Sequence, residues 1–239
     1  LPPLRGAPPG HIVLPAIHLT KDGIADTFRD HHTALDAARP LDEARDLTDE
    51  ARQALRQTFL DAEIGITGAN FLIAETGTAV IVTNEGNGDL VQTVPPVHVV
   101  VTGIEKVVPT AQDAFAMLRI LARSATGQEI TCYTTFATGP RRDGDHDGPE
   151  EFHIVLLDNG RADLLAGELR EALRCIRCGA CQSVCPVYRS VGGHAYGWVY
   201  GGPIGAVLTP GLIGHEAARD LPEASSLCGA CEEVCPVRI

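Results

Sequence analysis

Seven of the eight cysteines in this chain lie near its C-terminal end, at spacings that suit iron–sulfur ligation. The first run, from Cys175 to Pro186, has the pattern C-x2-C-x2-C-x3-C-P, and the second, from Cys228 to Pro236, has C-x2-C-x3-C-P. Cysteines three residues apart on a tight turn bind one cluster, whereas the cysteine before proline ligates the other cluster of a two-cluster protein. Each run is therefore expected to hold its own cluster and to lend one ligand to the other.

Residues 186–227 separate the two runs, a distance far greater than in the compact small bacterial ferredoxins. The arrangement resembles the α-helical ferredoxin domain of succinate dehydrogenase iron–sulfur subunits, in which helices carry the ligand turns. The crossing rule predicts two ligand sets. The first cluster takes Cys175, Cys178, Cys181 and Cys235, and the second takes Cys185, Cys228 and Cys231.

The second set lacks a fourth cysteine, which would fall at the position of Ser225. Three interpretations stay open: a [3Fe–4S] cluster, a [4Fe–4S] cluster with Ser225, another residue or solvent on the fourth iron, or a ligand from a partner protein. The first cluster is predicted to be [4Fe–4S], and the second [4Fe–4S] or [3Fe–4S]. Zinc is the other metal alternative, but it prefers one closed set of four ligands. Cys132, outside both runs, is expected to be a buried core thiol.

Charge and hydropathy narrow the class of protein. A net charge of -12 over 239 residues disfavours binding to nucleic acid or to anionic lipid. No apolar run reaches the roughly 18 residues of a membrane span, and the N-terminus lacks a signal-peptide core. Cysteine runs of this kind without a secretory signal indicate metal binding in a reducing cytoplasm. Because the chain begins with Leu1 and stops shortly after Cys235, we expect it to be a piece of a longer polypeptide.

Hydrophobic periodicity predicts an α/β domain over residues 1–165 and a helical, cluster-binding domain over 166–239. In the first domain, strands interleave with helices around a mostly buried sheet. Beyond about residue 165 strand signals nearly vanish, and a Gly-rich loop over 192–205 is expected to bring backbone N–H groups to sulfur. The predicted helices cover 22–38, 41–62 and 111–125, and the predicted strands cover 12–17, 70–74, 78–83, 97–101, 130–137 and 152–157.

Several longer stretches carry a resemblance to a known family. They are 65–77 (GITGANFLIAETG), 82–88 (VTNEGNG), 147–153 (DGPEEFH), 192–197 (GGHAYG), 202–208 (GPIGAVL) and 224–231 (ASSLCGAC). On these residues the chain resembles the lactate utilisation protein B family, which couples a LUD domain, of the NagB/RpiA/CoA-transferase type of α/β fold, to a two-cluster ferredoxin-like domain. Family members extend further at both ends, so the α/β domain is expected to be incomplete here.

The resemblance implies a cytoplasmic iron–sulfur electron carrier that works with two companion proteins in oxidising L-lactate to pyruvate, with all seven cysteines as ligands. The alternative is a LUD-domain enzyme that binds a small carboxylate or acyl substrate, with the clusters as electron outlet. For that alternative, Glu75 and Glu85 are the candidate carboxylates, because each lies in a turn after an apolar strand, where α/β folds place ligands. No dinucleotide-binding fingerprint is present, so we expect that this chain alone does not oxidise lactate.

Overall fold

The computed structural model describes residues 1–7, 16, 18–131 and 133–239. The chain divides into two compact units, one formed by residues 52–158 and the other by residues 1–51 together with 159–239. Except for residue 16, the strand expected over 12–17 lies outside the described residues. Cys132 lies outside them as well.

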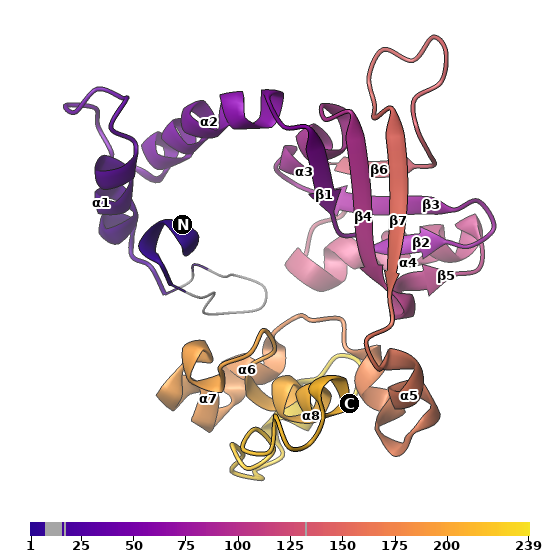
Figure 1. Ribbon diagram of the computed structural model, residues 1–239. Coiled ribbons are helices and arrows are strands. Elements are labelled where there is room, and N and C mark those ends of the chain that lie inside the picture. The colour runs from indigo at the N-terminus through magenta and orange to yellow at the C-terminus, as the bar shows by residue number, and fades with distance from the viewer. Residues whose placement is uncertain (8–15, 17, 132) are drawn as a thin grey trace. The chain divides into compact units, whose positions relative to one another are not determined.

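The unit of residues 52–158 contains two β-sheets (Figure 1). The first is wholly parallel, and its strands are β1 (Ile64–Thr67), β4 (Val97–Gly103) and β7 (Glu151–Leu157), in that order. The second is mixed, in the order β5 (Val107–Val108), β2 (Phe71–Ile73), β3 (Thr78–Thr83) and β6 (Tyr133–Ala137). The strands predicted within this unit are confirmed, with shifts of a few residues at their ends.

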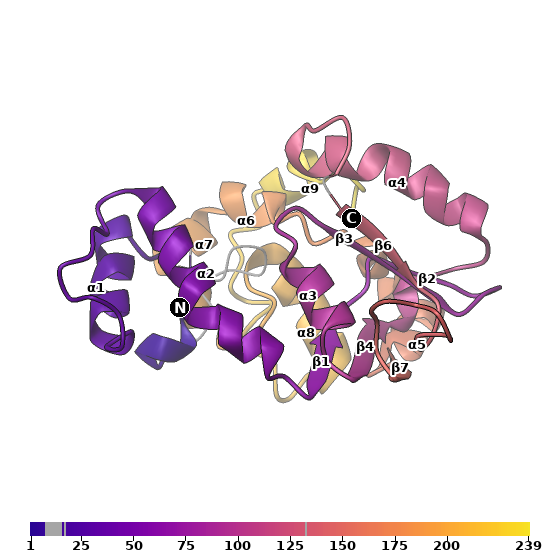
Figure 2. The ribbon, with the colours of Figure 1, turned by 90° about the horizontal axis from the view of Figure 1, so that it is seen from above.

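Helix α4 (Ala111–Thr126) covers one face of the second sheet. It begins at a capping box in which Thr110 and Asp113 bond to each other's backbone N–H groups, which fixes the first turn. Ala114 of α4 packs on Phe71 and Val80, and the opposite face of the sheet meets Val100 of β4. Figure 2 shows α4 on one side of the second sheet and strands β1, β4 and β7 on the other, so the unit has three layers.

The expectation of a mostly buried sheet is wrong for β7. Its last residues, Val155, Leu156 and Leu157, are 42–52% exposed. The exposure follows one face of the parallel sheet, because Ile64 and Ile66 of β1 and Val101 of β4, on the same face as Val155, are exposed as well. A short helix, α3 (Asn87–Thr93), also follows β3, where no helix was predicted.

Helix α1 (Lys21–His31) ends well before residue 38, where the sequence predicted its end, and α2 (Ala44–Leu60) follows it. Arg39 explains the early end of α1. Its Nη2 donates to the carbonyl of Phe28 at 3.2 Å and to Oε1 of Glu50 at 2.8 Å, so residues 33–40 must fold back over the end of the helix. Arg39 lowers the pKa of the buried Glu50 carboxyl below its ordinary value, which keeps the ion pair charged.

Residues 159–239 are helical, and no strand occurs among them, all of which are described. Besides short 3-10 turns, the helices are α5 (Arg161–Ala166), α6 (Ala180–Val184), α7 (Pro186–Val191), α8 (Gly202–Ile213) and α9 (Ala230–Val234). Leu164, Ala172, Ile204 and Leu208 form the buried core of this segment. Part of the loop expected over 192–205 is in fact the start of α8, where Pro203 occupies the first turn, a position that tolerates its missing N–H.

None of the helices in the described ranges combines the length and the apolar character that crossing a membrane would require.

Burial of His98 leads to a prediction about stability. Its ring is fully buried in β4, with Nε2 2.8 Å from Oγ1 of Thr67, and burial lowers its pKa below the ordinary value. A histidine that is neutral when folded takes up a proton on unfolding at low pH, so stability should fall as pH drops below about 6.5, by up to about 1.4 kcal/mol per pH unit. Urea unfolding at about pH 7 and about pH 5.5 should show this loss. The His98→Gln variant, whose new side chain does not titrate, should lose less stability between these two pH values. Equal losses in the variant and the wild-type protein would contradict the assignment of this pH dependence to His98.

Candidate metal centre

The two cysteine runs adopt the same local structure. Arg177, just before Cys178, has a φ of 59°, and Leu227, just before Cys228, has a φ of 54°. Left-handed backbone is uncommon for residues other than glycine, so its recurrence at equivalent positions shows that both runs follow one turn. Gly179 (φ 76°) and Gly229 (φ 78°) are the N-cap residues of α6 and α9. A β-carbon at either position would strain this left-handed backbone.

The two turns end alike as well. Cys185 follows α6 with φ -70° and ψ 119°, and Cys235 follows α9 with φ -70° and ψ 116°. Extended backbone at this point is the conformation that the following proline favours. Helices α6 and α9 pack against each other. The cysteine before each proline therefore has the same extended backbone in both runs.

The first candidate site is a cavity of about 140 Å³. Its lining includes all four cysteines predicted to bind the first cluster, namely Cys175, Cys178, Cys181 and Cys235, and also Cys231. The remaining lining is mostly apolar, with Ile204 and Val207 of α8 among its residues. The cysteine before the second proline thus lies in the cavity of the first run, as the crossing rule predicts.

The second candidate site is a more open cavity of about 460 Å³. Cys185, Cys228 and Cys231 line it, and so does Ser225. These are the three cysteines predicted for the second cluster together with the residue at the missing fourth position. Cys231 lines both cavities, and spacing alone assigns it to the second.

Backbone N–H groups point at the cysteine sulfurs. Arg177 N–H donates to Cys175 Sγ, Tyr188 N–H to Cys185 Sγ and Ile239 N–H to Cys235 Sγ, each at 3.4 Å. Cys181 Sγ accepts from the backbone N–H of Ile204 at the start of α8. Donors of this kind stabilise thiolate charge and influence the reduction potential of a bound cluster.

Burial differs from one cysteine to the next, since Cys185 of the second site is buried and Cys178 of the first site is exposed. It raises the pKa of the Cys175 and Cys181 thiols of the first site, because a thiolate without a metal is poorly solvated there. Cys228 of the second site is exposed, and the hydroxyl of Ser226 and the backbone N–H of Ala230 lower its pKa. The second site is therefore the more accessible to solvent on its Ser225–Cys228 side, where all four residues are exposed.

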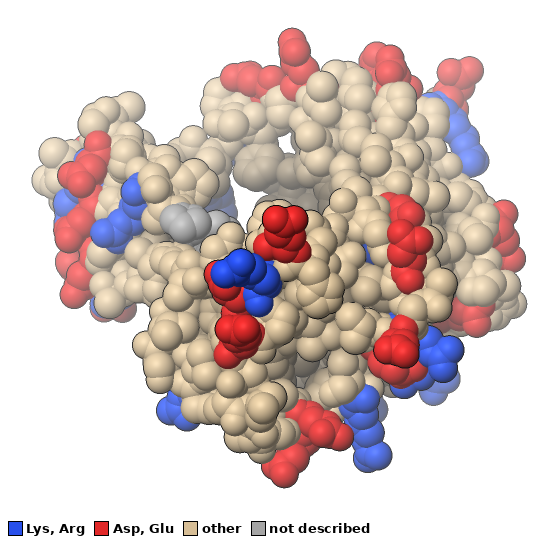
Figure 3. All heavy atoms as spheres, turned by 60° about the horizontal axis from the view of Figure 1, so that its bottom comes forward, with Lys and Arg blue, Asp and Glu red and all other residues tan. Residues whose placement is uncertain are grey.

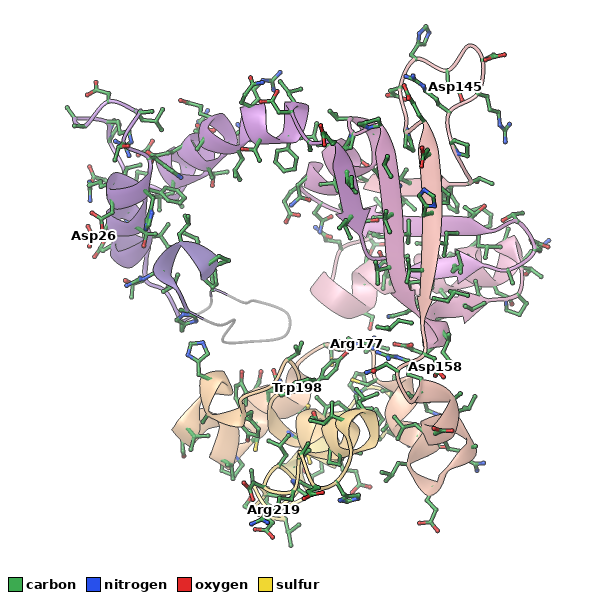
Figure 4. All side chains as sticks on the ribbon, in the orientation of Figure 1. Asp26, Asp145, Asp158, Arg177, Trp198 and Arg219 are labelled. Carbon is green, nitrogen blue, oxygen red and sulfur yellow. The ribbon has the colours of Figure 1, made fainter. Side chains whose placement is uncertain are left out.

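The charged residues beside the two sites also differ. Arg177 lies within the first run, and Arg238 follows Cys235. Figure 4 labels Arg177 just before α6; its Nε donates to the hydroxyl of Tyr200 at 3.3 Å. The second run carries Glu232 and Glu233 on α9 instead. Over the face seen in Figure 3, acidic and basic side chains are scattered, and no broad basic patch gathers there.

The buried hydroxyl of Tyr196 lies near Cys185, one of the cysteines of the second site. The hydroxyl of Tyr196 is buried and has no hydrogen-bond partner among the described residues. Burial raises the pKa of the Tyr196 hydroxyl above its ordinary value, and the nearby charge of Cys185 raises it further. A hydroxyl donor kept protonated next to a ligand thiolate suits a site that concentrates negative charge on sulfur. This hydroxyl and the thiols of Cys185, Cys228 and Cys231 fit an iron–sulfur cluster at the second site, and the cysteines that line the first cavity fit one there.

Within the described ranges, no three or more His, Cys, Asp or Glu side chains are arranged to hold a single metal ion.

The carboxylates considered for an enzyme are not brought together. Glu75 lies in the turn between β2 and β3, and its Oε1 accepts the N–H of Ala111 at 2.7 Å, so it caps the start of α4. Glu85 follows the other end of β3 and is exposed. The sequence placed both in turns after strands, but those strands form an antiparallel pair, and their turns lie at opposite ends of β3.

Known protein families match both parts of the chain. Residues 9–157 match the model of the LUD domain, and residues 171–239 match that of the 4Fe-4S dicluster domain. "Lactate utilization protein B" of Shouchella clausii is 53% identical over 97% of this chain and 48% of its own length. The protein of the same name from Bacillus subtilis is 51% identical over the same shares. The chain thus spans about half the length of these curated relatives.

One solved structure is also similar, a DUF162 family protein from Deinococcus radiodurans. It is 18% identical, with a TM-score of 0.31, over 58% of this chain and 98% of that one. Likeness at this level carries no argument about fold. The match to the LUD domain covers more than half of the chain, and a dicluster motif follows it. This chain therefore belongs to the LUD domain family and joins its LUD domain to a 4Fe-4S dicluster domain.

Proposed function

We propose that this chain is an iron–sulfur electron-transfer component that takes part in the oxidation of L-lactate to pyruvate in the cytoplasm, together with companion lactate-utilisation proteins. The proposed division is a LUD domain over residues 1–165 and a cluster-binding domain over 166–239. The proposed ligands of the first cluster are Cys175, Cys178, Cys181 and Cys235, and those of the second are Cys185, Cys228 and Cys231.

The reciprocal lining of the two cavities carries this proposal. Cys235 lines the cavity of the first run, and Cys185 lines that of the second. A zinc-binding pair of turns would have no need of such an exchange, since each site closes on its own four ligands. Iron–sulfur clusters, when bound, accept and release single electrons, at potentials set by hydrogen bonds to sulfur and by exposure.

The link to lactate is supported by the relatives named above, which are about half identical over nearly the whole of this chain. Removing two electrons and two protons from a 2-hydroxy acid requires a hydride acceptor and a base for the hydroxyl proton. The described carboxylates Glu75 and Glu85 do not converge, and Glu75 is engaged as a helix cap. We therefore place the hydride step on a companion protein or on a part of the polypeptide outside this sequence.

Redox titration of the anaerobically prepared chain tests this function against the enzyme alternative. Dithionite should bleach the cluster absorbance, and an oxidising dye should restore it over repeated cycles. L-lactate alone should leave the absorbance unchanged, because single-electron centres do not accept a hydride directly. Bleaching by L-lactate with no added flavoprotein would favour the LUD-domain enzyme, and irreversible bleaching by dithionite would contradict a carrier.

A further inference from the structure

Ser225 precedes the second run, at the position that corresponds to Cys175 of the first. With Cys178 matched to Cys228, the turn residues Arg177 and Leu227 coincide in their left-handed backbone, and Cys175 coincides with Ser225. Sequence spacing alone identifies this position as the site of a missing cysteine. The structure adds the conformation of the loop and the environment of the serine side chain.

The hydrogen bonds are equivalent as well. The N–H of Arg177 donates to Cys175 Sγ at 3.4 Å, and the N–H of Leu227 donates to Ser225 Oγ at 3.1 Å. The serine oxygen thus takes up, relative to its turn, the place that the ligand sulfur has in the first run. The distance is shorter because an N–H bonds oxygen at closer range than sulfur.

Ser225 also lines the second cavity together with the three cysteines proposed to bind there. The cavity therefore presents three sulfurs together with the hydroxyls of Ser225 and Ser226 and the side chain of Glu232. Of these oxygen-bearing residues, only Ser225 has the position, relative to its turn, that Cys175 has in the first run. Leu227 is 91% exposed and Cys228 is exposed, so the rim beside Ser225 is open to water, which can accept the hydroxyl proton.

We propose that Ser225 Oγ is the fourth ligand of the second cluster, so that this cluster is [4Fe–4S] with three thiolates and one serine oxygen. On binding, the Oγ–H bond breaks, an iron–oxygen bond forms, the proton passes to solvent and no electron is transferred. This inference rests on the proposed cluster assignment and deepens it. A harder oxygen ligand favours the more oxidised iron, so the second cluster should be reduced at a lower potential than an all-cysteine version of the same site.

Spectroscopy of variants in the full chain, enriched in iron-57, tests the proposal. Wild-type protein should show one iron with the Mössbauer parameters of mixed sulfur and oxygen ligation. Ser225→Cys should convert it to an all-sulfur spectrum and raise the midpoint potential of the second cluster. Ser225→Ala should lose that iron and yield the EPR signal of an oxidised [3Fe–4S] cluster, with the first cluster unchanged.

Ser226→Ala is the matched control, because this neighbouring hydroxyl hydrogen-bonds Cys228 and is not proposed to bind iron. It should keep the oxygen-ligated iron. Identical wild-type and Ser225→Ala spectra would overturn the proposal in favour of solvent, and a three-iron second cluster in wild-type protein would also overturn it. Both outcomes would leave the proposed function standing, whereas the absence of any cluster from wild-type protein would defeat both.

Discussion

Replacing Cys235 by Ser should remove or convert the first cluster and leave the second intact. Although Cys235 belongs to the second run in sequence, it lines the cavity of the first. Loss of that thiolate leaves the first cluster with three cysteines from its own run. The bound iron should fall by up to about half, if two four-iron clusters are present in wild-type protein.

Cys185→Ser is the reciprocal control, since Cys185 follows α6 but lines the second cavity. EPR spectra of the two reduced variants should lose complementary signals. The second-run variants Cys228→Ser and Cys231→Ser identify the signal of the second cluster independently. If Cys235→Ser erased the same signal as Cys228→Ser, the crossed assignment of ligands would be wrong.

Removing iron should unfold residues 159–239 while the unit of residues 52–158 keeps its structure. The buried core of the helical segment consists of Leu164, Ala172, Ile204 and Leu208, against which Cys175 and Cys181 pack. A core of this size in short helices rarely supplies enough stability alone, and small domains commonly rely on a metal. Because the ligands come from two distant turns, binding of the clusters and folding should be coupled.

Hydrogen exchange followed by mass spectrometry, on the full chain before and after anaerobic chelation of iron, measures this effect. Protection of amides in α6, α8 and α9 should be largely lost, and protection in β3 and β4 should remain as an internal control. Unchanged protection of α6 and α9 after complete removal of iron would show that the helical segment is stable without its clusters.

The spacing of the cysteines predicts two ligand sets, and the members of each set line a common cavity, so the assignment of ligands stays a prediction with geometric support. A ligand turn forms from residues that are close in sequence. The cysteine before proline at the end of each run is the one expected to bind the cluster of the other run. Thus the cavity linings follow the two predicted sets, with Cys231 as the shared residue. The strands β3 and β4 were predictable for a similar reason, since apolar, β-branched runs favour β-strands.

Other features depend on contacts between distant residues, which no local pattern encodes. The end of α1 is set by Arg39 reaching back to Phe28 and Glu50. The start of α8 looked like a loop because Gly and Pro are poor helix formers. Gly205 is nevertheless required there, since a β-carbon would come within 1.9 Å of the carbonyl oxygen of Tyr200. Glu75 is a candidate carboxylate of the enzyme alternative from its place in a turn, but its bond to the N–H of Ala111 makes it a helix cap.

Iron and acid-labile sulfide counts on anaerobically purified protein, combined with Mössbauer spectroscopy, test the central claim most directly. The two crossed cavities predict two clusters per chain, with about eight iron and about eight sulfide if both are [4Fe–4S]. All of the iron should give cluster spectra. One tightly bound zinc with no acid-labile sulfide, or a single cluster held by the first run alone, would contradict the account.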